Sequence, residues 1–198
     1  MRNKLVLALL AIALVGVAAC KTRTDRTDTG GVILAVTDFD GLPSVVSVNC
    51  FLAEVALGLC DAETYGTAHL SIGEITVENI VADPTGGSSR LMDVQLTRYQ
   101  IGFRRIDPGS RLPPTQFRNV GLFVPSNGTA SVTNLPLLSA EAFTNQPLTD
   151  LRLRNGGVDS ETGSETQLIE FELIFHGRTL SGDEVQSNAF TFTIEFRA

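Results

Sequence analysis

The sequence predicts an all-β fold, an antiparallel sandwich of two sheets with about seven to nine strands and at most one short helix. Three observations support this prediction. Apolar and polar residues alternate through several segments. Turn-forming residues separate these segments roughly every 8–12 residues. Almost no segment has the spacing of apolar residues that an amphipathic helix needs.

The alternation is clearest near the C-terminus. We expect strands over Leu168–Phe175 and Val185–Phe196, joined by a turn around Ser181–Glu184. Such strands bury one face and expose the other to water. The buried face of the last strand is expected to hold Phe190, Phe192, Ile194 and Phe196. Most of the eleven phenylalanines alternate in this way and are therefore expected in the core.

Two longer segments change phase part-way, which is the sequence pattern of a β-bulge. Leu70–Val81 changes phase around Gly73, and Val94–Ile106 changes phase near Thr97 and Arg98. Two shorter segments rich in β-branched residues are predicted to be the first strands: Val32–Thr37 and Val45–Cys50.

Glycine, proline and asparagine mark the predicted turns. Val120–Val124 and Ala130–Leu135 flank Asn127-Gly128, a strong signal for a tight hairpin between two paired strands. Asp107–Pro114 and Asn155–Glu165 are predicted to be irregular loops. Ser139–Phe143 is the one segment expected to form a short helix, with Ser139 as its N-terminal cap.

The predicted sandwich resembles the immunoglobulin and fibronectin type III folds. The likeness is architectural and is strongest over residues 165–198. Two hallmarks of antibody domains are missing, because the chain has no tryptophan, and Cys50 and Cys60 lie too close in sequence for a disulfide between the sheets. The resemblance therefore implies an immunoglobulin-like architecture and no activity.

The N-terminus has the layout of a secretory signal. Two basic residues precede an apolar run at residues 5–19, which is shorter than the ~20 residues of a membrane-spanning helix. The end of this run, Val17-Ala18-Ala19-Cys20, resembles the lipobox of bacterial lipoproteins. The resemblance implies cleavage before Cys20 and acyl chains (palmitate among them) on that cysteine as a membrane anchor. Lys21, in place of an aspartate, favours the outer membrane.

These features divide the chain into a signal peptide at 1–19, an acylated cysteine with a polar tether at 20–31, and a single sandwich domain at 32–198. Residues 21–31 have no apolar periodicity and span roughly 18 Å as a flexible coil. Residues 20–198 hold 13 basic and 22 acidic residues, a net charge of −9. This charge argues against nucleic acid as a partner.

Once Cys20 carries lipid, Cys50 and Cys60 remain as a pair, and an exported, oxidising setting favours a disulfide between them. Nine residues separate the two cysteines and no histidine lies nearby. Their spacing therefore fits neither a zinc site nor a Cys-x-x-Cys motif. The sequence predicts no metal site and no cofactor.

The candidate site residues are few. His69 and His176 are the only histidines, and no Gly-x-Ser-x-Gly motif accompanies them, so no catalytic residue is assigned. Two acidic turns have calcium binding as their alternative: Asp38 with Asp40, and Asp159 with Glu161 and Glu165. Five arginines either pair with neighbouring acids or form a basic stripe for an acidic partner: Arg98, Arg104, Arg105, Arg111 and Arg118.

The sequence favours a lipid-anchored protein of the cell envelope that acts as a non-enzymatic binding or structural module toward a protein partner. Two alternatives stay open, namely an accessory subunit of an envelope assembly that uses β-strand addition and a hydrolase with an unrecognised site. An unpaired edge strand without proline, lysine or a bulge would favour the first alternative. A pocket that sets a histidine against a carboxylate and a hydroxyl would favour the second.

Replacing the anchor residue tests the membrane assignment. Cys20→Ser removes the thiol that carries the acyl chains, so this variant is expected in the soluble fraction after a carbonate wash, while the wild-type protein stays with the membranes. Blotting both fractions measures the outcome. A variant that remained with the washed membranes would contradict the lipoprotein assignment.

Overall fold

The computed structural model describes residues 31–49, 69–83, 85 and 87–198. In this part of the chain, nine strands form two sheets, which confirms the predicted all-β sandwich. The strands are β1 (Val32–Asp40), β2 (Val45–Ser47), β3 (His69–Val81), β4 (Val94–Arg105), β5 (Gln116–Val124), β6 (Gly128–Ser139), β7 (Thr166–Thr179), β8 (Glu184–Gln186) and β9 (Phe190–Arg197). The helical turns are all 3-10: η1 (Arg90–Met92), η2 (Ala140–Thr144), η3 (Leu148–Leu151) and η4 (Leu153–Asn155).

The small sheet has the order β1-β3-β6, and the large sheet has the order β2-β9-β7-β4-β5, with β8 paired to β7. All pairs of these strands are antiparallel, as predicted, except the short strand β2 with β9, which are parallel. In the lettering used for immunoglobulin domains, the sheets correspond to A-B-E and A′-G-F-C-C′. This Greek-key order is that of an immunoglobulin-like sandwich.

The predicted β5–β6 hairpin is wrong, although its turn is present. Asn127 has a φ of 52°, as a tight turn around Asn-Gly requires, but β5 then pairs with β4 and β6 pairs with β3 in the other sheet. Two side-chain hydrogen bonds hold the chain where it passes from one sheet to the other. The Asn79 side-chain amide donates to the Val124 carbonyl at 3.3 Å, and the side-chain oxygen Oδ1 of Asn127 accepts from the Val81 N–H at 3.1 Å.

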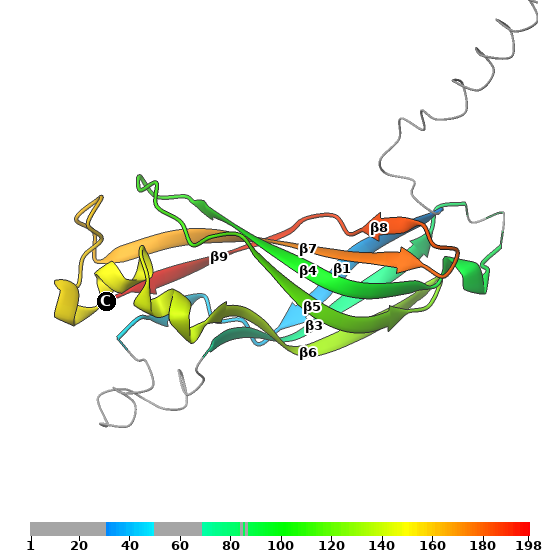
Figure 1. Ribbon diagram of the computed structural model, residues 1–198, viewed down its shortest axis with the longest axis horizontal. Coiled ribbons are helices and arrows are strands. Elements are labelled where there is room, and N and C mark those ends of the chain that lie inside the picture. Colours follow the sequence, from blue (N-terminus) through cyan, green and yellow to red (C-terminus); the bar gives the residue numbers. More distant parts are fainter. Residues whose placement is uncertain (1–30, 50–68, 84, 86) are drawn as a thin grey trace, which may run out of the picture.

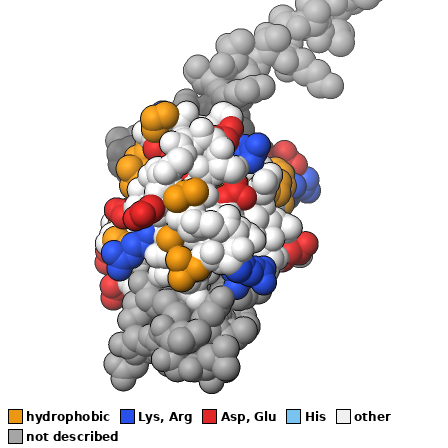
Figure 2. Space-filling view, turned by 90° about the vertical axis from the view of Figure 1, so that its left-hand side faces the viewer, with side chains coloured by type: hydrophobic (Ala, Val, Ile, Leu, Met, Phe, Trp, Pro, Cys, Tyr) orange, Lys and Arg blue, Asp and Glu red, His pale blue; other side chains and the backbone are white. Residues whose placement is uncertain are grey.

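The sandwich is elongated and has two distinct ends (Figure 1). At the proximal end, the chain enters β1 at Gly31, whose carbonyl accepts from the Ala82 N–H at 2.9 Å. The turns at residues 89–93, 125–128 and 180–183 lie at the same end. The distal end holds residues 106–115, residues 140–165 and the C-terminus. Figure 2 looks onto the distal end, where acidic and basic side chains are interspersed with small apolar groups.

The predicted bulge in β4 is present at Thr97. The pairing of β4 with β7 continues on both sides of Thr97 and skips this residue. As a result, Leu96 and Tyr99 are both buried although three positions separate them. Gly177 lies opposite the bulge, where a Cβ atom would be 2.4 Å from the Gln95 carbonyl oxygen. The bulge therefore requires glycine at position 177.

The phase change predicted in β3 is also present, but its bulge is not at Gly73. The buried face of β3 changes between Ile72 and Ile75. The pairing register shifts at two other places. One lies in the neighbouring strand β1, between Val36 and Asp38. The other lies at the start of β3, between Leu70 and Ser71, where the partner strand β6 carries the extra residue. The sequence of one strand shows a phase change, but it does not show which strand carries the extra residue.

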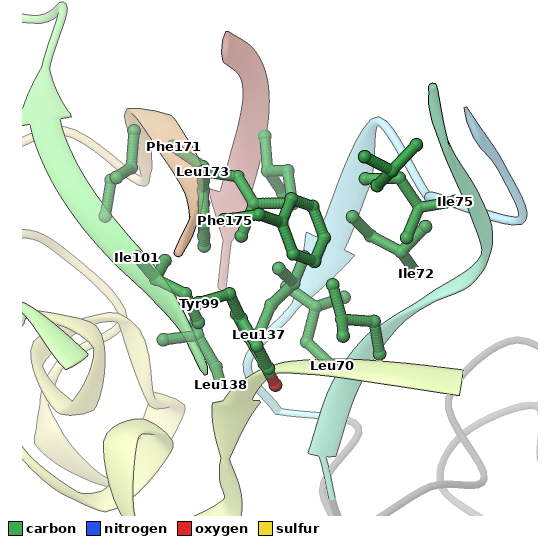
Figure 3. Packing of buried hydrophobic residues seen from close by; sticks show 14 of the residues in the cluster. Leu70, Ile72, Ile75, Tyr99, Ile101, Leu137, Leu138, Phe171, Leu173 and Phe175 are labelled. Atoms are coloured by element: carbon green, nitrogen blue, oxygen red, sulfur yellow. The ribbon is translucent and has the colours of Figure 1, made fainter. Parts of the chain in front are cut away.

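The core fills the space between the two sheets (Figure 3). Tyr99 lies on β4, the strand that carries the buried tryptophan of antibody domains. Its ring centroid is 6.0 Å from that of Phe175 on β7. Its hydroxyl donates to the Pro136 carbonyl of β6 at 2.8 Å, so this side chain joins the two sheets. Burial raises the pKa of Tyr99 above its ordinary value, against a smaller opposing effect of the Arg118 charge.

The alternation predicted for the C-terminal strands is confirmed, but the single strand predicted over Val185–Phe196 is two separate strands, β8 and β9. The inward face of β7 is fully buried, and it consists of Ile169, Phe171, Leu173 and Phe175. By contrast, Ser139–Phe143 forms no α-helix. It forms only the turn η2, and the Ser139 side chain makes no capping hydrogen bond. The signal peptide, the tether up to residue 30, and Cys50 and Cys60 with their predicted disulfide lie outside the described residues.

Two glycines beside the Thr97 bulge test its packing. Gly177→Ala places a methyl group against the Gln95 carbonyl, and overpacking of this kind costs about 3 kcal/mol of unfolding free energy or more. Gly121→Ala, on β5 with nothing within 4 Å of the new Cβ, is expected to change stability by less than about 0.5 kcal/mol. Urea unfolding of both variants measures the difference. Equal stabilities would show that the strands adjust around position 177.

Candidate functional site

A hollow on the outer face of the large sheet is the candidate site. It lies beside the Thr97 bulge, and its lining includes Thr97, Arg98, His176, Arg178, Glu184 and Gln186. The bulge creates the hollow because it leaves two successive residues of β4, Thr97 and Arg98, exposed on the outer face. Strands β7 and β8 supply the opposite side.

His176 supplies a neutral imidazole to this hollow. The residue is half-buried, and its Nε2 atom is enclosed without a hydrogen-bond partner among the described residues. Burial lowers the pKa of His176, and the positive charge of Arg98 lowers it further. Since the ordinary pKa of histidine is about 6.5, the imidazole is neutral at pH 7.

Arg98 joins the hollow to the edge of the sheet. Its guanidinium carbon lies 5.8 Å from the ring centre of Phe117 on β5, a cation–π contact. Phe117 is 61% exposed and Phe123, on the same outward face of β5, is 45% exposed. Among the described strands β5 pairs only with β4. We call Arg98, Phe117, Phe123 and His176 the outer-sheet surface.

Sequence reasoning missed the two exposed aromatic residues of this surface. Phenylalanines were expected mostly in the core, which is correct for Phe171, Phe175 and Phe196 and wrong for Phe117 and Phe123. A signal was present, because Gln116–Val124 carries apolar side chains in both phases of its alternation. A strand at a sheet edge with two apolar faces exposes one of them.

The five arginines of the predicted stripe do not share one surface. Arg98 faces the hollow, and Arg104 pairs with Glu170 on the outer face at 2.7 Å. Arg118 donates to the Gln116 side chain on the inward side of β5. Arg105 and Arg111 lie at the distal end, where acidic side chains contact both. Only Arg98 thus contributes to the outer-sheet surface.

Arg105 is the centre of a buried ionic network at the distal end. Its side chain is 2% exposed, and it donates to Asp159 at 2.8 Å and to Asp107 at 2.6 Å. Burial alone would raise the pKa of both carboxyl groups. The hydrogen bonds that each accepts from Arg105 and from nearby backbone N–H groups, with the Arg105 charge, outweigh burial and lower both pKa values.

The acidic turns weighed for calcium binding make other contacts. The Glu161 carboxylate accepts from the backbone N–H groups of Ser110 and Arg111, each at 2.8 Å. Asp38 and Asp40 each accept from the next backbone N–H, at 2.9 and 2.6 Å, and Glu165 is exposed. No group of three acidic, histidine or cysteine side chains that could hold a metal occurs in the part of the chain described here.

Among the described residues, His176 does not make the hydrogen bonds of a hydrolase triad through its Nε2 atom. The hollow places His176 near a carboxylate and a hydroxyl, those of Glu184 and Thr97. However, Glu184 accepts from Arg178 at 2.7 Å, and Nε2 of His176 has no partner among the described residues. In a hydrolase triad the histidine is hydrogen-bonded to both its nucleophile and its orienting acid. The other histidine, His69, begins β3, and its side chain lies outside the described parts.

No family model, curated protein sequence or solved structure matches this chain. Within the described residues, no helix is both long enough and apolar enough to cross a membrane.

The Arg105 network predicts a pH-dependent stability. Arg105→Met leaves two carboxylates without their cation, which costs about 3–5 kcal/mol at pH 7 for a buried pair. Folding lowers the pKa values of Asp107 and Asp159. The two carboxylates therefore contribute fully to the free energy of unfolding above the pKa of an unfolded aspartate, about 3.9. This contribution is lost as pH falls through their pKa values in the folded protein. The deficit of the variant should therefore shrink by pH 3.

Urea unfolding at pH 7 and pH 3 measures this deficit. Arg104→Met is the matched control, because the neighbouring Arg104 makes an exposed pair with Glu170 that contributes less than about 1 kcal/mol. A deficit for Arg105→Met that is the same at both pH values would show that the network does not act through the charges of Asp107 and Asp159.

Proposed function

We propose that this protein is a lipid-anchored module of the bacterial cell envelope that binds a protein partner and catalyses no reaction. One observation carries the binding part of the proposal: the edge strand β5 exposes two phenylalanines on one face, and Arg98 stacks on one of them. Aromatic and arginine side chains are enriched at protein interfaces and dominate their binding energy.

The arrangement of this surface supports binding. Phe117 and Phe123 stand on a strand held by β4, so little conformational entropy is lost when a partner covers them. Fully burying one such side chain contributes about 1.5–3 kcal/mol. Arg98 adds a charged group beside Phe117, and His176, its cross-strand partner, adds a neutral polar one. The stacked guanidinium of Arg98 favours a partner that presents a carboxylate next to an apolar side chain.

The lipobox supports the anchoring part of the proposal. A tether that enters at the proximal end leaves the long sides of the sandwich free, and the outer-sheet surface lies on one of these sides. An anchored protein of this kind meets its partner in the periplasm or at the cell surface. Both locations are compatible with a partner that recognises the side of the sandwich.

Strand addition at β5 is less favoured than recognition of its side chains. The strand is free of proline and lysine, as strand addition requires. However, its register with β4 shifts between Leu122 and Asn119, so that Val120 and Gly121 together lie opposite Thr97. An irregularity of this kind twists a sheet edge away from a further strand. The exposed face of β5 therefore supports binding better than its backbone edge does.

A photo-crosslinking amino acid at position 117 tests the proposed binding. Benzoylphenylalanine in place of Phe117, in cells that express the full chain, is expected to give one discrete heavier adduct with a partner protein. Arg98→Glu in the same protein should reduce this adduct on the order of tenfold, the effect of losing about 1.4 kcal/mol of binding energy. Blotting of the adduct, followed by mass spectrometry, measures both.

The matched control carries the same crosslinker at Thr129, which is exposed on β6 in the small sheet. No adduct of the same mass is expected from this position. The binding proposal would fail if both positions gave the same adducts, or if Arg98→Glu left the adduct from position 117 unchanged.

A further inference from the structure

We infer that the proximal end of the sandwich lies against the lipid surface, with Leu91 and Leu180 as its contact residues. This inference rests on the lipid anchor of the proposed function and adds an orientation and a second interaction surface. The partner of this surface is a bilayer with zwitterionic headgroups. The observations that carry it are the exposure of the two leucines and their position beside the point where the tether joins the sandwich.

Leu91 and Leu180 form one exposed apolar pair on neighbouring turns. Leu91 lies in η1 and is 60% exposed, and Leu180 lies in the β7–β8 turn and is 53% exposed. The two turns are held together because the Ser181 N–H donates to the Leu91 carbonyl at 3.0 Å and the Leu180 N–H donates to the Asp93 carbonyl at 2.9 Å. A rigid backbone thus presents both leucines.

The tether joins the sandwich next to this pair. Gly31 lies so close to η1 that a Cβ atom built on it would be 3.8 Å from Cε of Met92. A second exposed pair lies at the same end, because Ile33 and Ile80 are cross-strand partners one residue from the end of the β1–β3 ladder. Figure 1 shows the start of β1, η1 and the β7–β8 turn together at one end of the sandwich.

The length of the tether favours lipid over a protein as the partner of the proximal end. Eleven residues, 21–31, can reach at most about 40 Å even when fully extended, so acyl chains on Cys20 hold the proximal end within a few nanometres of the bilayer. At this distance the tether gives the leucines a high effective concentration at the membrane surface. A separate protein partner would have to enter the narrow space between this end and the headgroups.

The charges at this end select the kind of lipid surface. Arg90 is exposed next to Leu91, while Asp83 and Asp183 are exposed in the neighbouring turns. This mixture, in a chain of net negative charge, favours zwitterionic headgroups over an anionic surface. Two partly exposed leucines bind too weakly to hold a free domain at a membrane, so the contact depends on the anchor and sets the orientation of the anchored domain.

Tryptophan fluorescence tests this contact without background, because the chain contains no tryptophan. The full acylated chain carrying Leu91→Trp is reconstituted into phosphatidylcholine vesicles with and without bromine atoms on the acyl chains. Apolar side chains at an interface lie about 5–10 Å into the boundary between headgroups and acyl chains. The bromines are therefore expected to lower the fluorescence by roughly half.

Leu153→Trp is the matched control, since Leu153 is a leucine in the distal turn η4 and is 72% exposed. Bromine is expected to leave its fluorescence unchanged. Leu180→Trp is the second test variant, and it is expected to be quenched like Leu91→Trp. Near-equal quenching of the proximal and distal positions would overturn the inference.

Flotation of the same samples on a density gradient separates the two proposals. If the protein does not float with the vesicles, the lipid anchor is wrong and the inference fails with it. If the protein floats but bromine quenches neither proximal tryptophan, the anchor stands and the orientation is wrong. A blue-shifted emission without bromine quenching would assign the leucines to a protein contact and would also overturn the inference.

Discussion

The extra residue at Thr97 is the constraint on which both faces of the large sheet depend. Without it, β4 would alternate in a single phase, and Leu96 and Tyr99 would point to opposite faces. The bulge buries both side chains, and Tyr99 then reaches across the core to the Pro136 carbonyl. On the other face the same bulge exposes Arg98 beside His176 and Phe117. One local irregularity therefore completes the core and forms the candidate site.

The two ends of the sandwich are stabilised by different chemistry. At the distal end, a buried arginine joins two long loops through Asp107 and Asp159. At the proximal end, short turns are joined by backbone hydrogen bonds and by the Asn79 side chain. An ionic network can hold loops of irregular shape because each carboxylate accepts several donors at once. The short turns of the proximal end leave their apolar side chains exposed.

The sequence was a good guide to structure wherever one strand's own alternation determined it. The buried face of β7, the inward residues of β9 and the bulge at Thr97 follow from periodicity alone. It was a poor guide to which strands pair. Asn127-Gly128 signals a turn, but β6 lies in the other sheet because it pairs with β3, which is far away in the chain. The hollow depends on such pairings, so no local motif could reveal it.

The antiparallel pairing of β1 with β3 has a mechanical consequence. Within the described sheets β1 pairs along its length only with β3, and the hydrogen bonds of such a pair run perpendicular to the strands. A force applied at Gly31 along β1 loads these bonds in shear, so many must break together. A force directed away from the sheet would peel the strand off one bond at a time. The domain therefore resists lengthwise pulling from its N-terminus far better than peeling.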